Sequence, residues 1–245
     1  MSAILRVEAD RRRSYATAAS LVLTAWLALA VWSVSPYAEW LDHRRIDDIA
    51  VPLTVRLAVF TLGWTLMVIA MMLPGALIVL ARCLENKPFS ARRAAPVILA
   101  YLAVWAVSGS FSYLGDSGLH EMVKQVPALA GVIAPGVLLL AGIYELTPIK
   151  RICLSRCRAE GAAFKTLGQS SRRNLWTVGL WHGVFCLGSC GLLMLLMFAI
   201  GGANLIWMLI LGAIMTVERL SQRGEGVAQL LGAVLIVVSV LPVVV

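Results

Sequence analysis

The sequence is poor in charge for its length, and acidic residues are the scarcest charged class. Its 245 residues include 13 Asp and Glu and 21 Lys and Arg, so charged residues make up only 14% of the chain. Hydrophobic residues make up 60%, and the mean hydropathy is +0.86. Soluble globular, disordered and nucleic-acid-binding chains are excluded, because each needs far more polar surface than this composition supplies.

Several chemical signatures are also missing. The chain carries no phosphate-binding loop, no Ser-His-Asp arrangement and no zinc-protease helix motif, so we expect a binding protein rather than an enzyme. No Asp or Glu lies in the middle of an apolar run, which argues against a carboxylate proton relay. The apolar composition also excludes a disulfide-stapled secreted module, and five cysteines are an odd number for a disulfide framework.

Long apolar runs are what the chain has instead. Six stretches of at least 20 residues carry no charge, and the longest, 174–217, is interrupted at Gly201-Gly202, just before a suitable N-cap at Asn204. Since about 20 apolar residues form a helix that crosses a bilayer, we predict an all-α polytopic membrane protein: a basic N-terminal segment at 1–14, then a single transmembrane domain at 15–245. The seven predicted spans, of which the last two leave a six-span arrangement open, are 15–35, 55–81, 95–114, 126–147, 175–199, 204–220 and 226–245.

The basic residues predict the orientation. Four segments, before the first span and after the second, fourth and sixth, hold 17 of the 21 Lys and Arg. Loops rich in Lys and Arg stay in the cytoplasm, so we expect a bacterial inner-membrane protein with a cytoplasmic N-terminus. The first run is long for a signal peptide and lacks a clean cleavage site, which favours an uncleaved anchor.

The fifth predicted span carries a row of five residues that can bind soft metal ions: His182, Cys186, Cys190, Met194 and Met197. The first four are spaced four residues apart, and Met197 follows three residues after Met194. They fall within about 120° of one helix face. Thiolate, thioether and imidazole groups together suit copper(I), and zinc is the second choice. Packing is the better explanation for methionines at this spacing, so His182, Cys186 and Cys190 are the principal predicted metal ligands.

A second cysteine pair, Cys153 and Cys157, lies in the basic segment that precedes this span. If that segment is helical, both thiols share a face and can meet His182 and Cys186 near the cytoplasmic membrane surface. The surrounding basic residues are expected to lower the thiol pKa values. Secondary ligands are predicted at four further positions: Met71, Met72, Met194 and Glu145. Pro74 is expected to kink the second span beside these methionines.

Four separated motifs carry a family resemblance. They are Met71-Met72-Leu73-Pro74; Leu146-Thr147-Pro148-x-Lys150-Arg151-x-Cys153-x-x-x-Cys157; Gly179-x-x-His182-Gly183-x-x-Cys186-x-Gly188-x-Cys190; and Asn204-Leu205-x-Trp207-Met208 with Glu218. Over roughly residues 60–220 the chain resembles a bacterial family of predicted metal-binding integral membrane proteins, filed as a domain of unknown function. The resemblance implies metal binding through the Cys and His motifs, with a ligand set altered here at Ser189 and Glu145, where the family often has Cys and Gln.

The leading functional hypothesis is a membrane metal-handling protein. We expect it to bind a soft metal ion on the cytoplasmic side of the bundle and to transport it or deliver it to a membrane metalloenzyme. Its expected partners are the lipid bilayer and a metalloenzyme or metal chaperone but no nucleic acid, and a homo-oligomer remains open. Two alternatives stand beside it: a quinone-linked thiol-disulfide oxidoreductase, and a non-catalytic assembly or scaffold subunit of a membrane complex.

Overall fold

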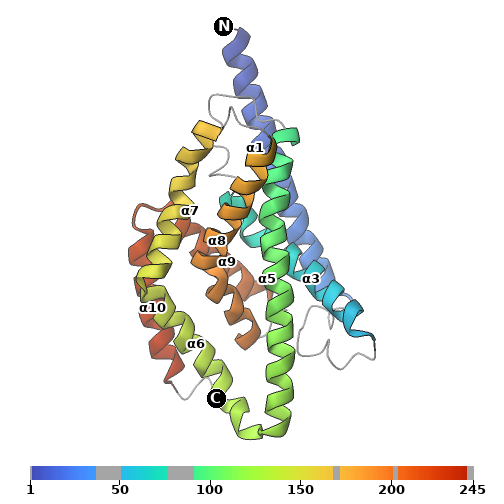
Figure 1. Cartoon of the computed structure of the whole chain (residues 1–245), viewed down its shortest axis with the longest axis vertical. Coiled ribbons are helices and arrows are strands. Elements are labelled where there is room, and N and C mark those ends of the chain that lie inside the picture. The colour runs from blue at the N-terminus through green and yellow to red at the C-terminus, as the bar shows by residue number, and fades with distance from the viewer. Residues whose placement is uncertain (1, 37–50, 77–90, 168–171, 201–203, 242–245) are drawn as a thin grey trace.

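The computed structural model describes residues 2–36, 51–76, 91–167, 172–200 and 204–241, and every element within these ranges is a helix (Figure 1). The predicted all-α class is confirmed. The elements are α1 (Ser2–Ser33), α3 (Leu53–Met71), α5 (Ala91–Gln125), the short 3-10 helix η2 (Pro127–Leu129), α6 (Ala130–Leu146), α7 (Pro148–Leu167), α8 (Arg172–Ile200), α9 (Leu205–Leu220) and α10 (Gly224–Ser239).

Within the ranges that the structure describes, four stretches of helix are long and apolar enough to cross a membrane: Leu53–Met71, Ala95–Gln125, Pro127–Leu146 and Leu175–Met197. Two shorter apolar helices, Ala19–Ser33 and Gly224–Ser239, accompany them. The predicted count of seven spans is therefore not confirmed, although each predicted span overlaps a helix. Large apolar side chains such as Leu62, Phe111 and Leu140 are well exposed on the outer faces of these helices, which suits a hydrocarbon environment.

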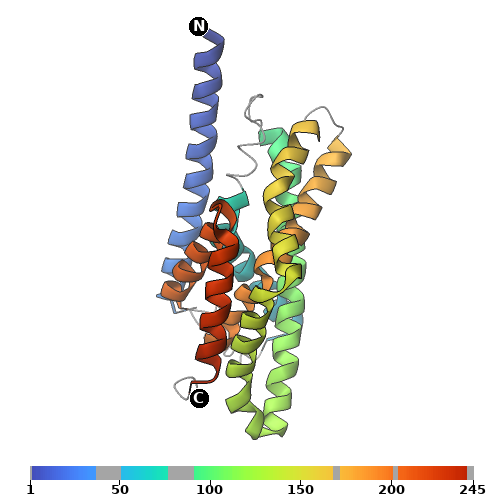
Figure 2. The same cartoon turned by 90° about the vertical axis from the view of Figure 1, so that its left-hand side faces the viewer.

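Helix α8 lies at the centre of the bundle (Figures 1 and 2). Half of its apolar window is buried inside the protein, against a third or less for the other three long helices. It packs against α5, α6, α7 and α9, while α10 covers α6 and α1 covers α3. The row of metal-ligand candidates on α8 is thus placed where several helices meet.

A Thr-Pro junction separates α6 from α7. Proline disfavours a helical conformation in the residue before it, and Thr147 is accordingly extended, with φ −72° and ψ 149°. Its hydroxyl accepts a hydrogen bond from the Lys150 backbone N–H at 3.3 Å, while Pro148 takes the first helical position, where it needs no donor. The segment predicted as a cytoplasmic loop is therefore an ordered helix, which sets the directions of Lys150 and Cys153.

Two other local predictions are confirmed. Asn204 caps α9, because its side-chain oxygen accepts from the backbone N–H groups of Ile206 and Trp207. Helix α3 ends at Met71, Met72 lies in a turn, and helical structure resumes at 73, where Pro74 limits backbone hydrogen bonding. The break places Met72 beside α9 rather than on the continuing face of α3.

Helix α9 presents one continuous buried face. Its buried residues recur every three or four positions, the helical period, and they are Met208, Leu211, Gly212, Met215, Glu218 and Arg219. Glu218 and Arg219 therefore continue the buried apolar face at the same helical spacing. Both charged side chains consequently point into the bundle instead of lying at a membrane surface.

Candidate metal centre

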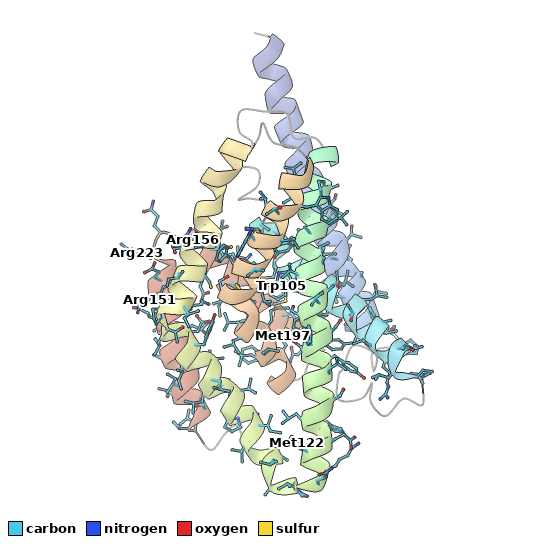
Figure 3. The ribbon with its side chains drawn as sticks, in the orientation of Figure 1. Trp105, Met122, Arg151, Arg156, Met197 and Arg223 are labelled. Atoms are coloured by element: carbon cyan, nitrogen blue, oxygen red, sulfur yellow. The ribbon has the colours of Figure 1, made fainter. Side chains whose placement is uncertain are left out.

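The predicted row on α8 is the buried face of that helix. His182 is 4% exposed, and the four sulfur-bearing residues that follow it are still less accessible: Cys186, Cys190, Met194 and Met197. Figure 3 shows Met197 in the interior of the bundle. The described cysteines are all free thiols: Cys153, Cys157, Cys186 and Cys190. Cys83 lies outside the described residues.

A single guanidinium brings three sulfurs together. The Nη2 of Arg219 on α9 lies 2.5 Å from the Sγ of Cys186, 3.3 Å from the Sγ of Cys190 and 3.4 Å from the Sδ of Met72. Its Nη1 donates to the Met72 carbonyl at 3.5 Å. Three helical segments that are distant in sequence therefore converge on one cation. We call the four residues that meet there the sulfur cluster: Met72, Cys186, Cys190 and Arg219.

Tyr101 on α5 joins the sulfur cluster to His182. Its hydroxyl lies 3.0 Å from the Cys186 Sγ, and either atom can donate. Its ring lies 5.5 Å, centroid to centroid, from the His182 imidazole, with a tilt of 34°. Since Tyr101 is 1% exposed, the hydroxyl is directed at sulfur inside a dry environment, where a hydrogen bond is strong.

The two cysteines of α7 approach the same region from the other side of α8. Cys157 is buried and interacts electrostatically with both Arg219 and Tyr101. Cys153 packs directly on α8, where a Cβ added at Gly188 would lie 2.7 Å from its Sγ. The segment is helical in the structure, which is the condition under which both thiols were expected to share a face. In this arrangement, no three His, Cys, Asp or Glu side chains among the described residues are close enough to hold a metal ion together.

The expected effect of the basic segment on thiol acidity is wrong for Cys153. Burial raises the pKa of this thiol above its ordinary value, and the neighbouring Lys150 lowers it by less. The reason is that burial penalises the charged thiolate. Arg151 and Arg156, which were expected to contribute, are exposed and lie at the outer edge of the molecule (Figure 3).

A second charged cluster lies beside the sulfurs. The Lys150 ammonium donates to Glu145 Oε1 at 2.7 Å and to Glu218 Oε2 at 2.9 Å, and all three side chains are at most 1% exposed. Arg158 adds a short hydrogen bond from its Nη2 to the Glu218 carbonyl. This cluster clamps α6, α7 and α9 together, so Glu145, a predicted secondary ligand, is engaged by an ammonium in this structure.

The other predicted secondary ligands lie at different places. Met72 belongs to the sulfur cluster, whereas Met71 packs against Gly212 on α9 and Met194 is fully buried in the core. The sequence does not distinguish Met71 from Met72, but the turn at the end of α3 does, because it directs only Met72 toward the sulfurs of α8 and Arg219 of α9.

Sequence reasoning missed Arg219, Tyr101 and Lys150. Lys150 and Arg219 were taken as topology determinants, and Tyr101 lies inside an apolar run without any distinguishing signal. Arg219 did carry a signal: it follows Met208, Leu211 and Met215 in helical phase. A charge in phase with a buried face points inward and needs a buried partner.

Comparison with curated proteins and with solved structures returned no match. Comparison with family models returned one, described as "PpoB2: Copper chaperone", which matches residues 61–242. This range contains all the residues of the sulfur cluster, His182, and both cysteines of α7.

Proposed function

Since the chain belongs to the PpoB2 family, whose description is copper chaperone, we propose that it binds copper(I) within a membrane-embedded helix bundle and delivers it to a membrane metalloenzyme. Copper is the cargo of the protein in this proposal. The principal ligands are Cys186 and Cys190, with Met72 as the thioether. His182 on the same helix, and Cys153 and Cys157 on the adjoining α7, serve as further ligands along the path of transfer.

The convergence of three sulfurs on one cation carries the proposal. Two thiols and a thioether lie within 3.4 Å of a single positively charged nitrogen. Soft sulfur ligands of this kind select copper(I) over hard cations. The cluster is buried, which excludes competing water and also protects copper(I) from oxidants.

The location of the exposed charges supports a membrane-embedded site near the cytoplasmic surface. The exposed Arg151, Arg156 and Arg223 gather at one side of the bundle, at the height of the α6–α7 junction (Figure 3). Basic side chains at such a level mark the cytoplasmic membrane surface. Lys150 of that junction interacts electrostatically with Cys190, so the sulfur cluster lies close to the cytoplasmic level in this proposal.

Metal binding by the purified full-length protein tests the proposal. Protein in detergent, under anaerobic reducing conditions, is loaded with copper(I) and then titrated with a chromogenic copper(I) chelator. We expect one copper per chain and a decrease in affinity of more than about 10-fold for Cys186→Ser, Cys190→Ser and Met72→Leu, since even indirect support of a ligand is worth that much. Met194→Leu is the matched control, as a buried methionine on the same helix outside the cluster. Failure of the wild-type protein to bind copper(I) would sink the proposal.

Membrane orientation needs its own measurement. Fusions of green fluorescent protein, which fluoresces only in the cytoplasm, and alkaline phosphatase, active only outside it, are made after residue 160 and after residue 121. The proposal requires a fluorescent fusion at 160 and an enzymatically active one at 121. The reverse result would place the α7 cysteines outside, where a thiol-disulfide oxidoreductase becomes the better hypothesis.

A further inference from the structure

Arg219 is held in an unusual way for a buried arginine. Its guanidinium is surrounded by sulfur and one backbone carbonyl, and its Nε is buried without a hydrogen-bond partner among the described atoms. Within the described part of the chain, no carboxylate forms an ion pair with it. A buried guanidinium ordinarily takes a carboxylate in bidentate geometry, so this one is poorly anchored for a purely structural role.

We propose that Arg219 occupies the position that copper(I) takes in the loaded protein, and that copper enters by displacing the guanidinium from the three sulfurs. The inference rests on the proposed function, because it concerns how that same site is filled. It assigns Arg219 as an internal stand-in cation, which keeps the sulfurs gathered and excludes other ions until the cargo arrives.

Distances make the two occupants mutually exclusive. A thiolate sulfur lies about 2.3 Å from a bound zinc ion, and a copper(I) ion needs a comparable separation. An ion at that distance from Cys186, Cys190 and Met72 falls within the space that Nη2 now fills, since Nη2 is itself only 2.5 to 3.4 Å from the three sulfurs. The guanidinium therefore has to move out before the ion can bind all three.

The exchange releases protons as well as the guanidinium. Each cysteine that binds copper(I) gives up its thiol proton to solvent, and the displaced guanidinium remains in the protein on Arg219. Soft thiolate and thioether ligands select copper(I) over harder divalent cations, so the sulfurs that hold the guanidinium favour copper(I) as the ion that replaces it.

Copper(I) affinity of Arg219 variants tests the inference. Interactions that exist only in the copper-free protein oppose binding, so their removal strengthens it. We expect Arg219→Gln to bind copper(I) about 10- to 100-fold more tightly than wild type, the equivalent of one or two lost hydrogen bonds to a charged group, and Arg219→Lys to lie between the two. Arg223→Gln, which removes an exposed arginine four residues away on the outside of the bundle, should leave the affinity unchanged.

The alternative outcomes are distinct. Weaker or unchanged copper(I) binding by a folded Arg219→Gln protein, still with one copper per chain, would overturn the exchange and make Arg219 a counter-charge that remains beside the ion. Absence of copper(I) binding by the wild-type protein refutes the proposed function instead. Folding of each variant is checked by its helical circular dichroism and its elution in detergent.

A wild-type measurement decides the matter if the variants do not fold. Copper(I) is diamagnetic, so the ¹⁵Nε resonances of the arginines can be followed in selectively labelled protein during loading. The Arg219 resonance is assigned by elimination, from variants in which each of the other arginines, such as Arg223, is replaced by lysine. It should shift strongly when copper(I) binds, whereas an unshifted Arg219 resonance at full loading would contradict the exchange.

Discussion

Lys150 and Glu218 lie 68 positions apart in the sequence, yet they form a fully buried ion pair, with the ammonium Nζ 2.9 Å from Oε2. Glu145 completes the cluster at 2.7 Å. One ammonium thus forms ion pairs with two carboxylates from different helices, α6 and α9. The clamp holds α6, α7 and α9 around the region that contains the sulfur cluster.

Removal of the ammonium should therefore be strongly destabilising. Lys150→Met would leave two buried carboxylates without the ammonium that pairs with both, and breaking a buried pair in this way costs about 3–5 kcal/mol. We expect this loss in the free energy of unfolding, measured by chemical denaturation in detergent. Lys124→Met is the matched control, because its partner Glu121 is exposed and such a pair contributes at most about 1 kcal/mol. Equal effects of the two changes would contradict the clamp.

The contact between α7 and α8 requires a glycine at position 188. A methyl group there would lie 2.7 Å from the Cys153 Sγ, so Gly188→Ala should push α7 away and destabilise the protein by about 1–3 kcal/mol, as overpacking does. Gly118→Ala on α5 is the control, because nothing lies within 4 Å of its added methyl. It should be neutral or stabilising by up to about 1 kcal/mol. Thermal unfolding in detergent distinguishes the two.

Tyr101 should support copper binding without being a ligand. Tyr101→Phe removes the hydroxyl that lies 3.0 Å from the Cys186 Sγ, and loss of such support around a metal ligand weakens binding by about 10-fold or more. Tyr144→Phe is the comparison: its hydroxyl donates to the Gly188 carbonyl, so stability should fall while copper(I) affinity is retained. Equal copper affinities for the two variants would show that Tyr101 only packs.

The cap of α9 can be tested independently of copper. Asn204→Ala removes the acceptor for the N–H groups of Ile206 and Trp207 and should destabilise the fold by about 1 kcal/mol. Asn204→Ser keeps a capping oxygen and should recover most of that loss. A folded Asn204→Ala protein with wild-type stability would show that packing alone positions α9.

Much of the fold and part of the site follow from local sequence. Helix type follows from the length of the apolar runs, and the Asn204 cap and the Thr147-Pro148 junction follow from the conformational preferences of those residues. The α8 row was predicted as one face because its spacing matches the helical period, and the structure buries that whole face. Spacing within one helix is a local property, so it can be recognised without knowledge of the fold.

The composition of the sulfur cluster was decided only by tertiary structure. Met71 and Met72 are neighbours with the same chemistry, and only the turn before Pro74 sends Met72 toward the cysteines. Among the described residues, four helices reach membrane length, so the predicted seven spans are not confirmed; hydropathy alone does not report how long each apolar helix is in the fold.

The sequence by itself determined an apolar all-α chain with His182 and two cysteines on one helix face. What it could not determine is which distant side chain faces them. Arg219 resembled a membrane-surface arginine in sequence, since charge counting treats every Lys and Arg alike. Packing of α9 against α8 and α3 turned that charge inward, 2.5 Å from Cys186, because the direction of a side chain depends on the position of the helix that carries it.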